Sequence, residues 1–227
     1  LCTDHGHHLG EKDVWGKPGV PLYEVMSHIP LLVAWPGRSG GDSTDALTTS
    51  VDLFATLTDL FGVQAEHRTH GESLVPLLDG SATSVREWAL MGVWGREVHV
   101  TDGTVKYARA PSGDNAPISM WSNRWSTMPI HAFPDIRLPR PDGRAYLDTM
   151  PGSDVPVIRQ PFVAGDALPY WAGSRFTGNH LWRVLEDPSE DEDRAGTAEE
   201  ADAEELLRHA LAQVEAPDDQ LVRLGLT

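Results

Sequence analysis

Short apolar runs alternate with amphipathic stretches along the first part of this 227-residue chain. Continuous apolar runs at residues 1–3 and 30–35 predict buried parallel strands, and residues 21–28 between them predict a short helix. Apolar residues recur at helical spacing over residues 51–61, which predicts a second helix. Because strands and helices alternate here, residues 1–80 are expected to form the edge of a doubly wound α/β sheet.

The pattern changes after residue 80. The runs that favour strands cover residues 87–94, 97–101, 105–109 and 179–185. Asp102-Gly103 is a hairpin signal between two of them, and residues 198–214 carry leucines at helical spacing. We therefore expect residues 81–227 to form a small C-terminal α+β subdomain with a short antiparallel sheet and a terminal helix. A long irregular insertion over residues 111–178 would interrupt it.

The insertion is rich in proline, tryptophan and arginine. Its notable side chains are Trp121, Arg124, Trp125, His131 and Arg159. Tryptophan and arginine together can shape a substrate pocket, because a guanidinium stacks on an indole. Stabilising a proline-rich segment that covers the sheet is an equally good interpretation.

The composition restricts the kinds of partner. There are 34 acidic and 18 basic side chains, a formal charge of −16, so nucleic acid is a poor partner. Much of this acidic excess lies in residues 186–205, so the charge is a property of the C-terminal end rather than of a site. No apolar run is long enough to span a membrane. The single cysteine excludes an internal disulfide, and the sequence favours a cytoplasmic location only slightly.

Candidate chemistry is concentrated near the start of the chain. Asp4 and His5 follow a predicted strand, where sites form in open α/β sheets. A carboxylate is a ligand for Ca²⁺, Mg²⁺ or Mn²⁺, and an imidazole can bind a metal or donate to an anion. Lys17 adds a positive charge suited to a sulfate or phosphate oxygen. His7 is a further candidate for the substrate pocket. An isolated Asp-His-Gly also fits a simple turn.

The surrounding sequence strengthens the functional interpretation. It reads Asp-His-Gly-x-x-Leu-Gly-Glu from residue 4, Trp-Gly-Lys at 15–17 and His-Ile-Pro-Leu-Leu-Val-x-x-Pro-Gly at 28–37. Together with residues 51–62, 70–79 and 181–190, this closely resembles the sulfatases of the alkaline phosphatase superfamily. The resemblance covers residues 1–80 and 179–195, with its motifs in the family's order.

The resemblance implies roles for individual residues. Family sulfatases cleave sulfate esters with a formylglycine nucleophile and a divalent metal, most often Ca²⁺, with Mg²⁺ or Mn²⁺ as alternatives. Asp4 matches a metal-binding aspartate. His5 matches a position beside the metal and the nucleophile, so it is both a metal-ligand and a catalytic candidate. Lys17 matches the lysine that contacts a sulfate oxygen, which makes it a catalytic and substrate-binding candidate alongside the substrate-binding candidate His7.

One departure from the family pattern is large. The motif Cys/Ser-x-Pro-x-Arg, from which formylglycine is made, does not occur in these 227 residues. Cys2 lacks it and matches a buried strand position, so it is expected to be a small apolar residue. We therefore expect the chain to be the C-terminal part of a sulfatase whose N-terminal catalytic half is absent. On its own it should be inactive, and the uncovered apolar face would allow self-association.

Three functions stay open at this point. The first is hydrolysis of a small-molecule or glycan sulfate ester by the full-length enzyme. The second is hydrolysis of a phosphonate or phosphate ester by an enzyme of the same superfamily. The third is a non-catalytic interaction module. The nucleophile motif that precedes this sequence would discriminate among them.

Overall fold

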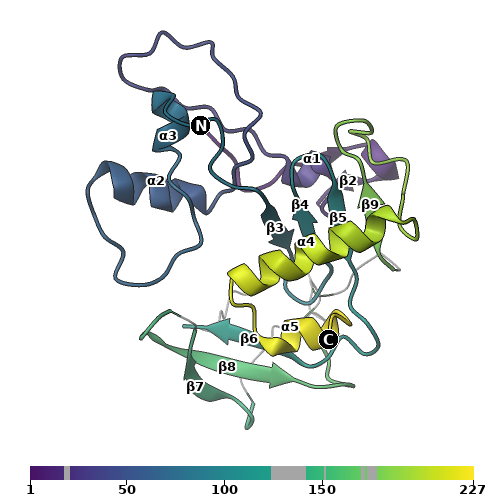
Figure 1. Ribbon diagram of the computed structural model, residues 1–227. Helices are drawn as coiled ribbons and strands as arrows, with labels where there is room; N and C mark the ends of the chain where they lie inside the picture. Colours follow the sequence, from purple (N-terminus) through teal and green to yellow (C-terminus); the bar gives the residue numbers. More distant parts are fainter. Residues whose placement is uncertain (18–20, 124–141, 151, 170–171, 173–177) are drawn as a thin grey trace.

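A four-stranded antiparallel sheet forms the centre of the molecule. The computed structural model describes residues 1–17, 21–123, 142–150, 152–169, 172 and 178–227 (Figure 1). This main sheet has the order β3-β4-β5-β9, with strands Ala89–Gly92, Val98–Thr101, Lys106–Arg109 and His180–Trp182. All four strands lie within the runs predicted from the sequence, so the short antiparallel sheet is confirmed.

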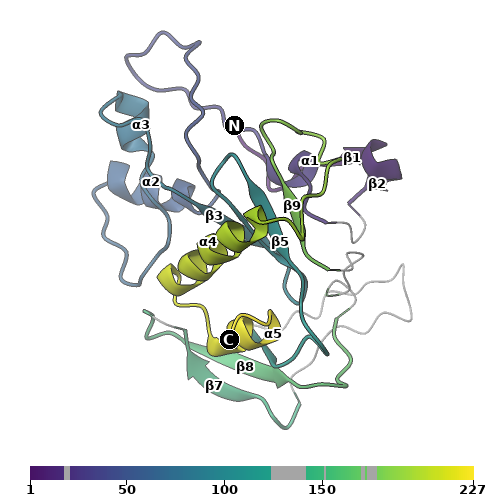
Figure 2. The ribbon, with the colours of Figure 1, turned by 45° about the vertical axis from the view of Figure 1, so that its right-hand side comes forward.

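The helix α4 (Glu199–Gln213) crosses one face of the main sheet, as Figures 1 and 2 both show. Strand residues Val100, Tyr107 and Leu181 are fully buried against Leu207 and Leu211 of this helix. Apolar side chains on one face of each element produce this packing, because burying them removes apolar surface from water. The predicted terminal helix is therefore confirmed, and a short helix α5 (Asp218–Arg223) follows it.

A second antiparallel sheet lies within the stretch expected to be irregular. Its order is β6-β8-β7, with strands Ile118–Ser122, Pro156–Phe162 and Tyr146–Thr149. The prediction of an irregular insertion over residues 111–178 is thus wrong for much of its described part. Pro156 pairs with β7 and Pro161 with β6, and each lacks a backbone N–H, so neither donates a hydrogen bond to the sheet.

Contacts between side chains far apart in the sequence hold the second sheet together. The Arg159 guanidinium lies 4.5 Å from the ring centre of Trp121 and 5.8 Å from that of Tyr146. It also pairs with Asp148 and Asp219 at 3.3 and 3.1 Å. These contacts fit the stabilising interpretation of this segment. The other candidates named there, Arg124, Trp125 and His131, lie outside the described residues.

The first forty residues depart most from the expected strands. Cys2 and Leu31 form a single antiparallel bridge, so the parallel strands predicted at residues 1–3 and 30–35 are wrong. Leu32 and Val33 are exposed, and so is Cys2, which was expected to be buried. One bridge cannot hold a strand, because a strand pair is stable only with further strands or a covering layer. The regular elements present are η1 (Glu11–Asp13), α1 (Glu24–Ser27), β1 (His8–Leu9) and β2 (Trp15–Gly16).

The helix α2 (Asp52–Leu60) confirms the helix predicted over residues 51–61. Its buried side chains are the polar Asp52 and Thr56, whereas Phe54 and Leu57 are 45% and 53% exposed. The apolar side of α2 is therefore the uncovered one in this structure. The short helix α3 (Val75–Asp79) follows it.

A buried ion pair fixes α2 to the segment that leads into β3. Arg86 donates to both oxygens of the Asp52 carboxylate, with Nε 3.0 Å from Oδ2. The same carboxylate accepts the backbone N–H groups of Thr49 and Glu72.

Within the described parts of the chain, no helix is both long and apolar enough to cross a membrane. A division into domains at residue 80 stays a prediction.

Candidate active site

The Asp4-His5-Gly6 turn rests directly on the helix α1. The Gly6 N–H donates to the carbonyl oxygen of Met26 at 2.9 Å. A Cβ atom at position 6 would lie 1.7 Å from the carbonyl oxygen of Val25, so only glycine allows this approach. The glycine of the motif is thus explained by backbone packing, and α1 becomes the platform that places Asp4 and His5.

The β1–β2 hairpin brings Lys17 back to this turn. His8 pairs with Gly16 and Leu9 pairs with Trp15, and Lys17 follows β2 immediately. The Lys17 Nζ lies 2.7 Å from Nε2 of His5. Two of the residues proposed from the sequence, twelve positions apart, are therefore in direct contact.

The hydrogen bonds of His5 identify its tautomer. Nδ1 lies 2.6 Å from the carbonyl oxygen of Gly6, which can only accept, so Nδ1 carries the proton. Nε2 of the neutral ring is then an acceptor, and the ammonium of Lys17 donates to it. Nε2 also lies 3.7 Å from Oδ2 of Asp4. Asp4, His5 and Lys17, hereafter the Asp4 site, form one continuous polar group.

The Asp4 site is open on one side. The Asp4 side chain is 85% exposed and that of His5 is 32% exposed. A hydrogen bond from its own backbone N–H lowers the pKa of the Asp4 carboxyl. Asp4 is therefore ionised at neutral pH, as an oxygen ligand for a hard cation must be.

The other histidines of the run have different environments. His7 is exposed, and no contact found in the described residues joins it to the Asp4 site. His8 is fully buried, with Nδ1 3.1 Å from the carbonyl oxygen of Glu11 and its ring edge-on to Tyr23. The carboxylate of Glu11 accepts the Leu9 N–H at 2.6 Å. His8 and Glu11 thus shape the hairpin.

The residues present fit one side of a divalent-metal site. Asp4 supplies a carboxylate oxygen, which suits Ca²⁺, Mg²⁺ or Mn²⁺. Both ring nitrogens of His5 are engaged here, one by the Gly6 carbonyl and one by Lys17, so His5 could bind a metal only in place of Lys17. Ca²⁺ takes six or more oxygen ligands. Among the residues described, no group of three or more His, Cys, Asp or Glu is arranged to hold a metal. The remaining ligands would have to come from elsewhere.

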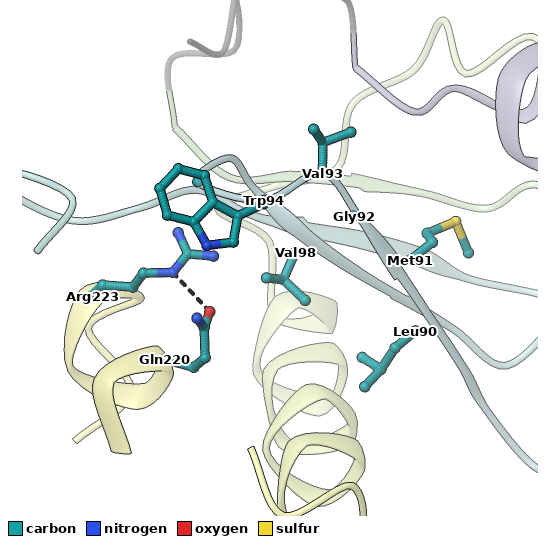
Figure 3. Close-up of a pocket in the computed structure, with 9 residues that line it drawn as sticks. Leu90, Met91, Gly92, Val93, Trp94, Val98, Gln220 and Arg223 are labelled. Atoms are coloured by element: carbon teal, nitrogen blue, oxygen red, sulfur yellow. Dashed lines mark hydrogen bonds between the residues drawn. The ribbon is translucent and has the colours of Figure 1, made fainter. Parts of the chain in front are cut away.

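A separate groove lies between β3 and α5. It encloses about 330 Å³ and has Trp94, Gln220 and Arg223 on its walls, and Figure 3 shows Arg223 donating to Gln220. The guanidinium of Arg223 is also bonded to the carbonyl of Arg96 and to Asn115, so it is satisfied within the protein. None of the three residues of the Asp4 site lines this groove.

Two buried charged residues near the site, one lysine and one glutamate, were not predicted from the sequence. Lys106 on β5 is fully buried, and Glu190 is 3% exposed in the loop after β9. A lysine in a strand and a glutamate in an acidic run are both expected on a solvated surface. Nothing in the local sequence therefore distinguishes these two residues from their exposed neighbours.

Comparison with known proteins gives the same picture as the motifs. Residues 10–93 match the family model described as N-sulphoglucosamine sulphohydrolase, C-terminal. A choline-sulfatase of Rhizobium meliloti is 33% identical over 113 residues, covering 47% of this chain and 22% of the relative. An arylsulfatase K of Xenopus laevis is 32% identical over 128 residues, covering 51% and 24%. The chain thus spans about a quarter of the length of these relatives.

Solved structures confirm the fold class. A putative sulfatase from Bacteroides thetaiotaomicron superimposes with a TM-score of 0.57 at 16% identity, covering 94% of this chain and 36% of that one. A 2-O GAG sulfatase gives the same TM-score and identity, with 95% and 36% covered. The fold is therefore one found in sulfatases. The chain is similar to sulfatases, and its residues 10–93 match the model of a C-terminal region.

Proposed function

We propose that this chain supplies one side of the active site of a sulfuric ester hydrolase, the larger protein that contains it. The observation that carries the proposal is the contact of Lys17 with His5 beside Asp4. Its relatives support the proposal, since the family model and the curated relatives are all sulfatases. The organic part of the substrate is a small molecule or a glycan, because its relatives include a choline-sulfatase and a 2-O GAG sulfatase.

Each residue of the Asp4 site has a distinct role in this proposal. Asp4 holds one side of a divalent cation, which supplies positive charge against the sulfate group. Lys17 contacts a sulfate oxygen with its ammonium, which stabilises the negative charge that develops there. His5 accepts from Lys17 and so orients it, while the Gly6 carbonyl fixes the ring. His7, two residues after His5, is exposed, and its role in the substrate pocket rests on the family resemblance alone.

The attacking group is not among these residues. In this proposal the nucleophile would be a formylglycine outside the present sequence, while this chain orients the ester and neutralises its charge. Removing a nucleophile removes most of an enzyme's rate, while binding contributions persist. The 227-residue chain alone is therefore inactive in this proposal.

The test uses the full-length protein that contains this chain. It is assayed with an aryl sulfate, an aryl phosphate and an aryl phosphonate, each with Ca²⁺, Mg²⁺ or Mn²⁺. The proposal expects metal-dependent turnover with the sulfate ester as the best substrate, and none by the chain alone. A clear preference for the phosphate or phosphonate would replace it with the second hydrolase. No turnover with any ester under any metal would leave only the non-catalytic interaction module.

A further inference from the structure

A buried lysine joins the main sheet to the helix that carries the candidate site. Lys106 on β5 is completely inaccessible to solvent. Its Nζ lies 3.1 Å from Glu24 Oε1, 3.0 Å from Glu190 Oε1 and 3.0 Å from the Ser27 hydroxyl. Glu24 and Ser27 are the first and last residues of α1. One ammonium group therefore holds both ends of this short helix, and these four residues are called the Lys106 network.

Besides its pairing with Lys106, Glu190 contacts α1 directly. Its Oε2 accepts the backbone N–H of Glu24 at 2.5 Å, which satisfies a free amide at the start of the helix. Its own carbonyl oxygen accepts from Lys12 Nζ at 2.7 Å, and Lys12 also pairs with Asp191. The hairpin between His5 and Lys17 is thus tied to the same loop as α1.

The connection continues from α1 to the site itself. The Met26 carbonyl in the middle of α1 accepts the N–H of Gly6, and the Val25 carbonyl packs against the Gly6 Cα. Figures 1 and 2 agree in placing α1 beside β5 and β9, at one end of the main sheet. Any shift of α1 on the sheet would therefore move Asp4 and His5 with it.

Stability alone does not explain a charged network at this place. Lys106 and Glu190 are withdrawn from water, Glu24 stays 21% exposed, and burial raises the pKa of Glu190. An apolar contact of similar volume would stabilise the docking of α1 as well or better. A network with directional bonds instead fixes one position and one rotation of the helix, which is what an active-site platform requires.

We propose that Lys106 is a positioning residue for the Asp4 site: it fixes α1 on the main sheet and, through α1, the Asp4-His5-Gly6 turn. It acts through α1 and touches no substrate. The proposal that this positioning serves catalysis rests on the sulfatase function proposed above. The mechanical link from Lys106 to the Gly6 amide can be tested separately.

The first experiment measures amide hydrogen exchange in the full-length protein. Lys106→Met should speed exchange at Gly6 and at the α1 amides about tenfold or more, because their anchor is lost. Amides of α4, on the opposite face of the sheet, should keep their rates. Unchanged exchange at Gly6 and α1 in a folded Lys106→Met protein would overturn the proposal.

Two further variants make the outcome decisive. Arg86→Met breaks a buried ion pair of α2 that has no contact with α1, and it should leave Gly6 exchange at the wild-type rate. Glu24→Gln keeps the size of the side chain and weakens its bond to Lys106, together with its pairing to the exposed His28, so it decides the question if Lys106→Met does not fold. If Glu24→Gln leaves Gly6 exchange unchanged, or if Arg86→Met speeds it equally, the link is wrong.

The second experiment measures kinetics with a sulfate ester. Lys106→Met and Glu24→Gln should lower kcat about tenfold to a hundredfold with little change in KM, because the bound ester is misplaced relative to Asp4. Arg86→Met should keep the kcat of the wild type. Faster Gly6 exchange with no turnover in the wild type would refute the sulfatase function and keep the link. Wild-type turnover that survives Lys106→Met unchanged would refute the catalytic role of the link.

Discussion

The ammonium of Lys17 lies 2.7 Å from Nε2 of His5, and Nδ1 of the same ring is held by the Gly6 carbonyl. This relationship orders a flexible lysine without neutralising it, because the neutral ring only accepts from it. The charge stays available to an anionic ligand. The turn, the hairpin and α1 together hold Asp4, His5 and Lys17 in a preorganised arrangement.

The ion pair between Arg86 and Asp52 should dominate the stability of the α2 region. Arg86→Met leaves the Asp52 carboxylate buried without its countercharge, which should cost about 3–5 kcal/mol in the free energy of unfolding. Urea denaturation of the wild type and the variant measures this difference. Arg183→Met removes solvent-accessible pairs with Glu186 and Glu199 and should cost no more than about 1 kcal/mol. Equal losses in the two variants would contradict the burial argument.

Acid should destabilise the main sheet through His99. This side chain is fully buried on β4, and among the described residues neither ring nitrogen has a hydrogen-bond partner, although Glu97 Oε1 lies 3.8 Å from Nε2. Burial lowers the pKa of His99 below its ordinary value of 6.5. The unfolded chain therefore binds the proton first, and stability present above pH 6.5 is lost as the pH falls below it.

Unfolding free energies measured across this pH range test the role of His99. The contribution of one such group reaches about 1.4 kcal/mol per pH unit. His99→Leu should flatten the acid slope by that amount, whereas His67→Gln, at an exposed histidine, should leave it unchanged. A slope that His99→Leu does not alter would mean that other groups govern the acid response.

The uncovered side of α2 should make the isolated chain associate with itself. Phe54 and Leu57 expose apolar surface that burial in a second molecule would remove from water. Sedimentation velocity should show concentration-dependent dimers or larger species, which Leu57→Lys reduces. Val222→Lys, at a comparably exposed apolar residue on α5, is the matched control and should not change the distribution. A monomer at all concentrations would contradict this prediction.

Much of the C-terminal fold is predictable from local pattern. The strands β3, β4, β5 and β9 and the helix α4 all follow from apolar spacing and a hairpin signal, because each buries one face against the other. The second sheet is not predictable in this way. Its central strand β8 contains two prolines, Pro156 and Pro161. The sheet is held by the stacking of Arg159 on Trp121, a contact that spans 38 positions and leaves no periodicity.

The candidate site is likewise predictable only in part. Asp4, His5 and Lys17 are identified from a contiguous motif, and the structure brings them together. The parallel strands predicted around them fail because apolar runs indicate burial but not the partner that provides it. Lys106 and Glu190 are not predictable in this way, because nothing in the sequence distinguishes a buried charged residue from an exposed one.

The isolated chain should bind divalent metal weakly. Asp4 and His5 provide far fewer ligands than the six or more that Ca²⁺ takes. Titration calorimetry with Ca²⁺ should show no saturable site in the micromolar range, and Asp4→Ala should give the same trace as the wild type. A tight stoichiometric site would mean that this chain contains further ligands and that the active site is not shared with another part of the protein.

The central claim is that the Asp4 site acts on the sulfate group, and steady-state kinetics of the full-length enzyme with one sulfate ester test it most directly. Lys17→Ala should lower kcat/KM by roughly a hundredfold to a thousandfold, the effect of losing one charge-assisted contact of about 2.7–4 kcal/mol. Asp4→Ala should cost more, since it removes a ligand of the cation. Arg144→Ala, which removes a cation from the second sheet, should retain wild-type activity. If Asp4→Ala and Lys17→Ala fold correctly and also retain wild-type activity, the account is contradicted.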